Sequence, residues 1–249
     1  MIKQAIIPLA GLGTRLLPLT SVIPKELLPI NGKPGLEYIL DECLNAGIKE
    51  IIFIISDKKK IIKKYFYNDS FFKRIIKKKK NDNIIKSKYL KIKKFKKMIK
   101  FVYQNSPRGT GDAILKCARI VKSKYFLMLL PDDLIMKKNC SLDMIKLHKK
   151  YKSSVIASKK VSKNDVSRWG IFKVKKIDRR NFFIKDVIEK PKIKNAPSNY
   201  AVIGRYILPS KIFSILKKQR AGKNNEIHIT DAIRTLIKDE NKFIGHIFS

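Results

Sequence analysis

The sequence predicts an α/β fold, a Rossmann-like three-layer α/β/α sandwich with a mostly parallel central sheet. Strongly apolar segments of strand length alternate with amphipathic segments of helical period, and the first strand ends at a glycine-rich turn. A chain of 249 residues with 44% hydrophobic content is long enough to bury a core. No internal repeat or linker divides it, so we expect a single domain over residues 1–249.

The first sixty residues contain the clearest unit. Residues 2–9 are apolar nearly throughout and stop at AGLGT, which is typical of a buried parallel strand. Over residues 33–46 the apolar positions recur at helical spacing, with Pro34 in the first turn and Gly47 at the exit. Residues 50–55, EIIFII, predict a second buried strand, and the β-loop-α-β unit should have a right-handed crossover.

The middle of the chain is less regular. Residues 71–100 are mostly lysine, isoleucine and phenylalanine, and residues 77–80 are an unbroken basic block, so we expect a solvated excursion here. The later pattern predicts strands at 100–103, 125–130, 171–174, 183–189 and 201–208, and helices at 113–120, 211–217 and 230–238.

The formal net charge of +37 is the most unusual feature of the composition. Clustered cations release counterions from phosphate backbones, so such a charge favours a protein that binds nucleic acid. Lysine, isoleucine and asparagine are abundant together while arginine is comparatively scarce, a pattern that AT-rich coding bias produces without any partner. We therefore expect no specific nucleic-acid partner, and only nonspecific attraction of polyanions at low salt.

The cysteines and the hydropathy indicate the compartment. Cys43, Cys117 and Cys140 lie far apart and form no CxxC pair, which argues against a disulfide framework and against a zinc site. The N-terminal segment lacks the features of a signal peptide, and no run reaches the roughly 20 apolar residues that span a bilayer. We expect a cytoplasmic protein with no membrane partner.

The glycine-rich turn AGLGTR follows the first strand. Gly11 and Gly13 allow backbone amides to approach a phosphate or a base edge without an intervening Cβ. Position 16 is leucine where a dinucleotide fingerprint requires glycine, and the GK[ST] of a Walker A loop is absent. Taken alone, the turn is equally consistent with a phosphate-binding loop and with a tight strand-to-loop connection that binds no ligand.

A second loop, IPKELLPI over residues 23–30, follows the glycine turn. Its two prolines stiffen a segment that presents Lys25 and Glu26 between apolar anchors, and the spacing places Lys25 beside Arg15. Two cations held on a glycine turn suit a triphosphate, because charge grows on the departing pyrophosphate oxygens when the α-phosphorus is attacked.

Together, AGLGTRLLPLT and IPKELLPI resemble the signature of the nucleotidyltransferases that join a nucleoside triphosphate to a sugar-1-phosphate. QNSPRGTGDAI, LLPDDLI, VIEKP and APSNYAVIGRYIL follow in the family's order, so the resemblance covers residues 1 to about 240. The sequences of these motifs are most similar to those of the uridylyl branch of the family. It implies the nucleotide-diphospho-sugar transferase type of sandwich, the substrates UTP and glucose-1-phosphate, the products UDP-glucose and pyrophosphate, and Mg²⁺ as cofactor.

The resemblance also implies roles for single residues. Asp132 would hold Mg²⁺, Arg15 and Lys25 would face the phosphates and the leaving group, and Lys190 would hold the phosphate that attacks. These four residues are the expected catalytic set. The residues implied to bind the nucleotide are Ala10, Gly11, Gly13, Thr14, Glu26, Gln104 and Gly109, and those implied to bind the sugar phosphate are Gly170, Glu189 and Val202.

Two features depart from the family pattern. Asp112 stands in GTGDA where uridylyl relatives often carry histidine, which leaves the choice of base partly open. The sequence stops at Ser249, before the second aspartate that completes the family's metal site and before the C-terminal helices that help oligomers to form. We therefore expect weaker activity, and the resemblance leaves homo-oligomer formation open.

Two other functions compete with the enzyme. A catalytically weakened or inactive relative that binds sugar nucleotide would fit the missing C-terminal motif. A polyanion- or RNA-binding protein would fit the charge, but no RNP-like aromatic motif or zinc pattern accompanies it.

Overall fold

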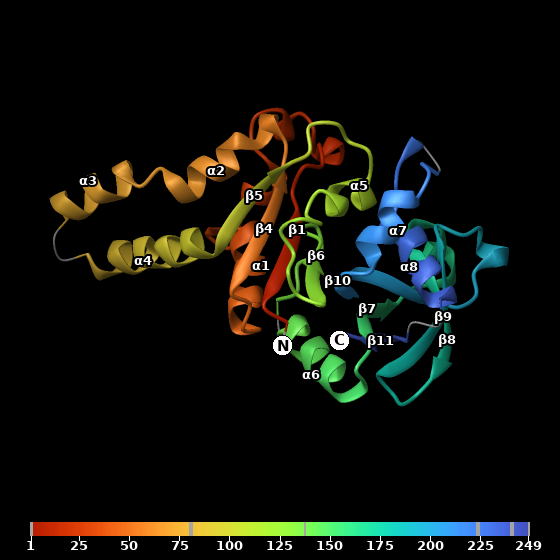
Figure 1. The fold of residues 1–249 in the computed structure, drawn as a ribbon. Helices are drawn as coiled ribbons and strands as arrows, with labels where there is room; N and C mark the ends of the chain where they lie inside the picture. The colour runs from red at the N-terminus through yellow and green to blue at the C-terminus, as the bar shows by residue number, and fades with distance from the viewer. Residues whose placement is uncertain (1, 80–81, 137, 223–224, 240–241, 249) are drawn as a thin grey trace.

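A nine-stranded sheet forms the centre of the computed structural model (Figure 1). Its strand order is β5-β4-β1-β6-β10-β7-β11-β9-β8, and a separate two-stranded sheet pairs β2 with β3. The strands are β1 Gln4–Pro8, β2 Pro29–Ile30, β3 Lys33–Pro34, β4 Glu50–Ile55, β5 Ile99–Tyr103, β6 Tyr125–Leu129, β7 Ser154–Lys160, β8 Gly170–Lys176, β9 Asn181–Glu189, β10 Tyr200–Pro209 and β11 Phe243–Ile247. The structure describes residues 2–79, 82–136, 138–222, 225–239 and 242–248.

The sheet has two halves. From β5 to β6 all neighbours are parallel, as the β-loop-α-β reading predicted. β10 is antiparallel to β6 and β7, and β9 is antiparallel to β11 and β8, while β7 and β11 pair in parallel. Parallel strands align their carboxyl ends along one edge, which is where open α/β sheets bind ligands.

Helices cover both faces, which confirms the three-layer α/β/α sandwich. Alternate residues of a strand point to opposite faces, and here Ala5 and Ile7 pack into one core while Ile6 packs into the other. The first core includes α1, α2, α4 and α6, and the second includes α5, α7 and α8. The helices are α1 Gly35–Asn45, α2 Lys60–Tyr67, α3 Ser70–Lys78, α4 Asn83–Met98, α5 Thr110–Leu115, α6 Cys140–Tyr151, α7 Ile212–Lys218 and α8 Ile229–Lys238.

The predicted start and end residues of α1 are confirmed. Pro34 is its N-cap, and Gly47 follows its end with a φ of 81°. The amide of Gly47 donates to the carbonyl of Leu44 and that of Ile48 donates to the carbonyl of Cys43, which together make a Schellman motif. This turn directs the chain back into β4.

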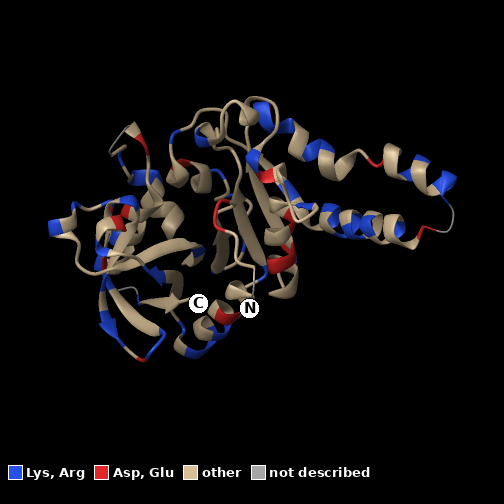
Figure 2. Cartoon of the chain, turned by 180° about the vertical axis from the view of Figure 1, so that it is seen from behind, with Lys and Arg blue, Asp and Glu red and all other residues tan. Residues whose placement is uncertain are grey.

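The expected solvated excursion over residues 71–100 is present, since the segment leaves the sheet and α3 has no buried residue, but its helices were not predicted. This segment forms α3, α4 and the start of β5, and with α2 it makes a helical arm, residues 60–98, that projects from the sheet (Figure 1). Phe72 of α3 stacks on Tyr89 of α4 at a centroid distance of 5.8 Å, and Phe95 is buried. Figure 2 shows many Lys and Arg positions along the helices of the arm. Of the basic block 77–80, residue 80 lies outside the described residues.

Other boundaries differ in detail from the predicted ones. α5 begins earlier than the predicted helix at 113–120, since the glycine turn itself enters the helix. β2, β3, β7, β11, α2 and α6 were not predicted, and neither were the short 3-10 helices of the described residues. The 3-10 helices are Thr14–Leu16, Leu19–Ser21, Lys25–Leu27, Asp57–Lys59, Lys163–Arg168 and Ile193–Asn195. Within the described part of the chain, no helix has the length and apolarity to cross a membrane.

Candidate active site

The candidate site lies at the carboxyl ends of the parallel strands. Ala10 and Gly11 follow β1, Gln104 follows β5, and Asp132 comes shortly after β6. The amide of Gln104 donates to the carbonyl of Ile55 at 2.9 Å, which extends the strand pairing to this residue. Residues that are distant in sequence are therefore gathered on one edge of the sheet.

The glycine-rich turn is held by a short local network. Gly13 has a φ of 73° and is the N-cap of the first 3-10 helix. Its carbonyl accepts a hydrogen bond from the Thr20 hydroxyl at 2.9 Å, and a Cβ added to it would lie 3.2 Å from the Thr20 methyl. By contrast, a Cβ on Gly11 would meet no atom within 4 Å. Gly13 is therefore required by the fold of the loop, whereas Gly11 leaves open space beside its backbone.

Arg15, Lys25 and Asp132 form one ionic cluster. Lys25 Nζ lies 2.5 Å from Asp132 Oδ1, and Arg15 Nη2 lies 3.6 Å from Asp132 Oδ2. The Arg15 side chain is 89% exposed and that of Asp132 is 42% exposed, so the cluster is open to solvent. Three of the four residues expected to carry the catalysis are thus brought together.

Glu26 has a partner that the sequence did not reveal. Lys59, at the end of the 3-10 helix after β4, donates to both carboxylate oxygens of buried Glu26 at 2.9 Å. Burial lowers the pKa of Lys59, and the charge of Glu26 opposes that shift. Lys59 stands in the run SDKKK, where nothing marks it out from its neighbours. The contact of Glu26 with a base stays a prediction.

The Asp132 loop is anchored on β10. The amide of Leu130 donates to the Gly204 carbonyl at 2.8 Å, and the Gly204 amide donates to Asp133 Oδ2 at 2.7 Å. A Cβ on Gly204 would lie 2.6 Å from the Cβ of Leu130, so only glycine allows this approach. Asp133 is therefore an anchor for the loop, which leaves Asp132 directed at the cations.

A buried ion pair stands behind this anchor. Arg205 of β10 is 0% exposed and donates from Nε and Nη2 to the Glu42 carboxylate of α1 at 2.8–3.0 Å. Its Nη1 donates to the carbonyl of Leu130 at 3.2 Å. Ser141 adds a hydroxyl donor to Glu42. Arg205 was not among the predicted site residues, although a single charge inside the apolar segment AVIGRYIL is a usable signal.

The residues expected to bind the sugar phosphate also converge. A Cβ on Gly170 would lie 3.1 Å from a methyl of Val202 and 3.2 Å from Glu189 Oε2. Glu189 Oε2 accepts from the Thr230 hydroxyl at 3.0 Å, and Lys190 Nζ lies 3.8 Å from Glu189 Oε1. The four residues, which come from β8, β9, β10 and the turn after β9, therefore share one neighbourhood.

Tyr206 connects the two groups electrostatically. It is buried in β10, and burial raises the pKa of its hydroxyl, with further increases from the charges of Asp133 and Glu189. β10 contacts both regions directly, since the Gly204 amide donates to Asp133 Oδ2 and Val202 lies against Gly170, which is beside Glu189. Among the described residues, Lys190 pairs with Glu189 and forms no ion pair with the cluster of Arg15, Lys25 and Asp132, so its place beside the phosphates stays a prediction.

The turn that begins α5 packs against another backbone. Gly109 has a φ of 93°, and a Cβ there would lie 2.7 Å from the Ile227 carbonyl. The Gly111 amide donates to that carbonyl at 2.7 Å, and the Ile227 amide donates to the Arg108 carbonyl at 2.8 Å. Gln104 donates from Nε2 to the Gly109 carbonyl. The segment around Ile227 therefore closes one side of the turn.

Comparison with known proteins assigns the chain to a family. The model of the nucleotidyl transferase family matches residues 4–249. The chain belongs to this family.

Relatives within the nucleotidyl transferase family agree with one another. The UTP–glucose-1-phosphate uridylyltransferase of Streptococcus pyogenes is 36% identical over 248 residues, which cover 97% of this chain and 81% of the relative. A Methanocaldococcus jannaschii protein provisionally assigned the same activity is 39% identical and covers 97% and 84%.

Solved structures support the same assignment. A UDP-glucose pyrophosphorylase in complex with UDP-glucose has a TM-score of 0.87 at 36% identity, covering 100% of this chain and 91% of that one. The UTP-bound enzyme of Acinetobacter baumannii has a TM-score of 0.89 at 31% identity and covers 100% and 87%.

Nucleotidyl transferases usually depend on a divalent metal. Among the described residues, no group of three or more His, Cys, Asp and Glu side chains is placed to hold one. Magnesium keeps several waters and commonly takes one or two carboxylates together with substrate phosphates. The solvent-accessible carboxylate of Asp132, beside the cations, fits that requirement as a protein ligand, whereas Asp133 is occupied by Gly204.

Proposed function

We propose that this chain transfers the uridylyl group of UTP to glucose-1-phosphate, forming UDP-glucose and pyrophosphate. The observation that carries the proposal is the cluster of Arg15, Lys25 and Asp132 at the carboxyl edge of the parallel strands. The agreement of relatives at 36–39% identity over most of their length supports the choice of substrates.

In the proposed reaction an oxygen of glucose-1-phosphate attacks the α-phosphorus of UTP. The bond from that phosphorus to the oxygen bridging to the β-phosphate breaks, and pyrophosphate leaves with the electron pair. The attacking oxygen is already anionic, so the residues need only align it and stabilise charge. Arg15 and Lys25 supply the positive charge that stabilises the phosphates on the nucleotide side, and Lys190 holds the attacking phosphate.

Binding of the nucleotide changes the partners of Lys25. In the structure its ammonium pairs with Asp132. The triphosphate would compete for Lys25, and the Asp132 carboxylate would then be the protein group that holds Mg²⁺. The ion, when bound, neutralises phosphate charge.

On the sugar side, we assign Glu189 to the hexose. Its Oε2 accepts from Thr230, which fixes the carboxylate, and Oε1, which lies 3.8 Å from Lys190 Nζ, would accept from sugar hydroxyls beside that cation. Gly170 and Val202 bring the backbone and an apolar surface to the same place. Residues 1–249 would then act as one nucleotidyltransferase domain. The free, buried thiols of Cys43, Cys117 and Cys140 fit the expected cytoplasm.

The test is direct. Purified protein is incubated with UTP, glucose-1-phosphate and Mg²⁺ while pyrophosphate release and UDP-glucose are followed, with TTP, CTP and ATP in parallel. We expect turnover that is highest with UTP and absent without glucose-1-phosphate.

The same assay separates the competing functions. Binding of UDP-glucose without turnover would identify a catalytically inactive relative. Tight, salt-sensitive RNA binding with neither turnover nor UDP-glucose binding would favour the polyanion-binding protein and contradict the proposal.

A further inference from the structure

Gln104 is held in one orientation by two acceptors. Its side chain is buried, and Nε2 lies 2.7 Å from Asp112 Oδ2 and 3.3 Å from the Gly109 carbonyl oxygen. Within the described part of the chain, nothing donates a hydrogen bond to its Oε1. Oε1 is therefore the one polar atom of this side chain that remains for a ligand.

The chemistry of the two acceptors excludes the opposite orientation. A carboxylate and a carbonyl have no proton to donate, so each must face the NH₂ group of the Gln104 amide. Rotating the amide by 180° would place Oε1 against Asp112 and Gly109, with two acceptor–acceptor contacts in a buried site. Asn at position 112 would offer a donor, which removes the closer of these two acceptor–acceptor contacts and leaves only the longer one to Gly109.

We propose that Asp112 is a positioning residue that makes the base site selective for pyrimidines with a protonated N3. It acts through Gln104, whose Oε1 it directs toward the base. The inference rests on the proposed function, in which Gln104 meets the nucleotide. It settles the question of base choice that Asp112 raised in the sequence.

The selectivity follows from the edges of the bases. Uracil and thymine carry N3–H, a donor that matches Oε1. Cytosine presents N3 as an acceptor, so with Gln104 locked it faces a second acceptor, and a buried contact of this kind is strongly rejected. The same lock does not separate uracil from thymine, which differ only at C5.

The position of Asp112 is itself well fixed. It is the third residue of α5, which begins at Thr110, where the helix dipole favours a carboxylate. Gly109 and Gly111 press against the backbone of Ile227 and leave no space for this turn to shift. A rigid turn is what a positioning role requires.

The test compares Asp112→Asn with the unaltered chain, using UTP, TTP and CTP at saturating glucose-1-phosphate. The substitution keeps the shape and lets residue 112 donate to Oε1, so the amide of Gln104 can rotate. We expect the ratio of kcat/KM for CTP to that for UTP to rise by at least about 10-fold. The ratio for TTP to UTP should not change.

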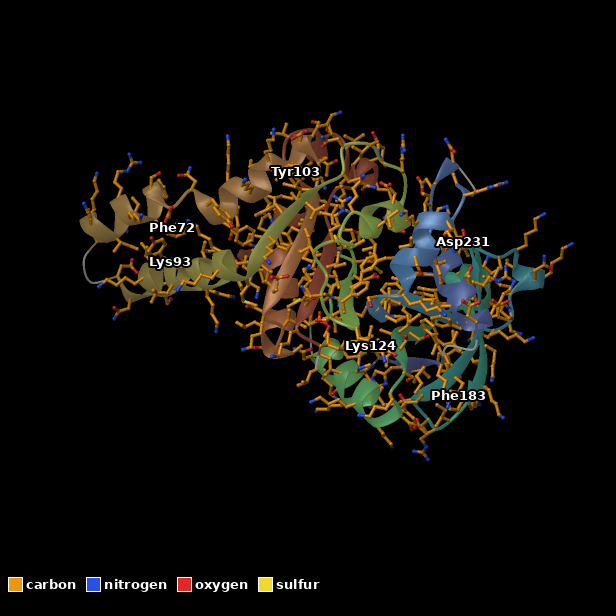
Figure 3. The ribbon with its side chains drawn as sticks, viewed as in Figure 1. Phe72, Lys93, Tyr103, Lys124, Phe183 and Asp231 are labelled. Carbon is orange, nitrogen blue, oxygen red and sulfur yellow. The ribbon has the colours of Figure 1, made fainter. Side chains whose placement is uncertain are left out.

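A matched control removes the same charge elsewhere. Asp231 is exposed and is the third residue of α8, at the same helix position as Asp112 (Figure 3). Asp231→Asn should leave both ratios unchanged. Gln104→Ala should lose the discrimination against CTP, and adding Asp112→Asn to it should produce no further change in the ratio.

Each outcome decides the inference. An unchanged CTP:UTP ratio in Asp112→Asn overturns it, as does strong rejection of CTP by Gln104→Ala, which applies even when Asp112→Asn fails to fold. If the unaltered chain forms no UDP-glucose, the proposed function fails by itself. Calorimetric binding of UTP and CTP to the same variants then gives the ratio without turnover.

Discussion

Arg205 is the residue on which the core and the site both depend. Its guanidinium is fully buried and satisfied by Glu42, by Leu130 and by its own neighbour Gly204. Removing one partner of a buried pair leaves the other charge uncompensated, which is far more costly than the loss of an exposed pair.

We predict that Arg205→Met lowers the free energy of unfolding by about 3–5 kcal/mol. Urea denaturation followed by circular dichroism measures this change. Arg168→Met serves as the control, because Arg168 is 73% exposed and pairs only with Asp165, and it should cost less than about 1 kcal/mol. Equal losses in the two variants would contradict the prediction.

Lys25 and Lys190 should separate in kinetics. Lys25→Ala removes stabilisation of the leaving group and should lower kcat by about 10²- to 10³-fold. Lys190→Ala should mainly raise KM for glucose-1-phosphate, since it removes the cation that captures the attacking phosphate. Steady-state kinetics of pyrophosphate release measures both, with the exposed Lys192→Ala as a neighbouring control. An unchanged KM in Lys190→Ala argues against its role.

At the residue scale, motifs made the site predictable. Three short segments with characteristic motif sequences contain Arg15, Lys25 and Asp132, and the structure places these residues in one cluster. Lys59 and Arg205 could not be found in this way, because a buried partner is a property of the tertiary structure. A lysine among many lysines carries no local sign that it will be enclosed beside Glu26.

At the element scale, strands were easier to predict than helices. The run EIIFII is apolar after Glu50, as expected for a strand that is covered on both faces, so β4 can be recognised without an alternating pattern. The helices of the arm were hidden, since their lysine-rich composition resembles a solvated loop. Their order comes from packing between α2, α3 and α4, which the local sequence does not report.

The C-terminal strand gives a pH-dependent prediction. His246 of β11 is buried, and its Nδ1 lies 2.9 Å from Asn181 Oδ1 of β9. Burial lowers the pKa of His246 below its ordinary value of 6.5; the Arg180 charge also lowers this pKa, and the charges of Asp143 and Asp178 oppose the shift. As pH falls through 6.5 the unfolded chain takes up a proton that the folded chain does not.

Stability should therefore fall as pH falls from neutral to mildly acidic, and His246→Gln should reduce this slope. Chemical denaturation of both proteins between pH 7.5 and about 5.5 measures the slopes. The difference in slope between the two proteins measures the contribution of His246 to the loss of stability. Carboxylates titrate below this pH window and contribute little to either slope. Parallel curves for the two proteins would show that His246 does not contribute.

At the scale of the whole molecule, the charge is an energetic burden on the fold. A net charge of +37 repels itself in the compact state, and the arm concentrates part of it on a projection (Figure 2). We predict that the melting temperature rises as NaCl increases from 20 to 300 mM, because screening reduces the repulsion. Differential scanning calorimetry measures it, and equal concentrations of KCl should reproduce the effect. A melting temperature that falls with salt would contradict the prediction.

One strand supports both halves of the proposed site. β10 carries Val202, which lies beside Gly170, and, two and three residues later, Gly204 and Arg205, which hold the Asp132 loop. In the proposed reaction, the attacking and departing oxygens would therefore both be positioned by the same backbone. A change that bends β10 would then move the attacking and departing oxygens out of line, while each substrate still binds when it is offered alone.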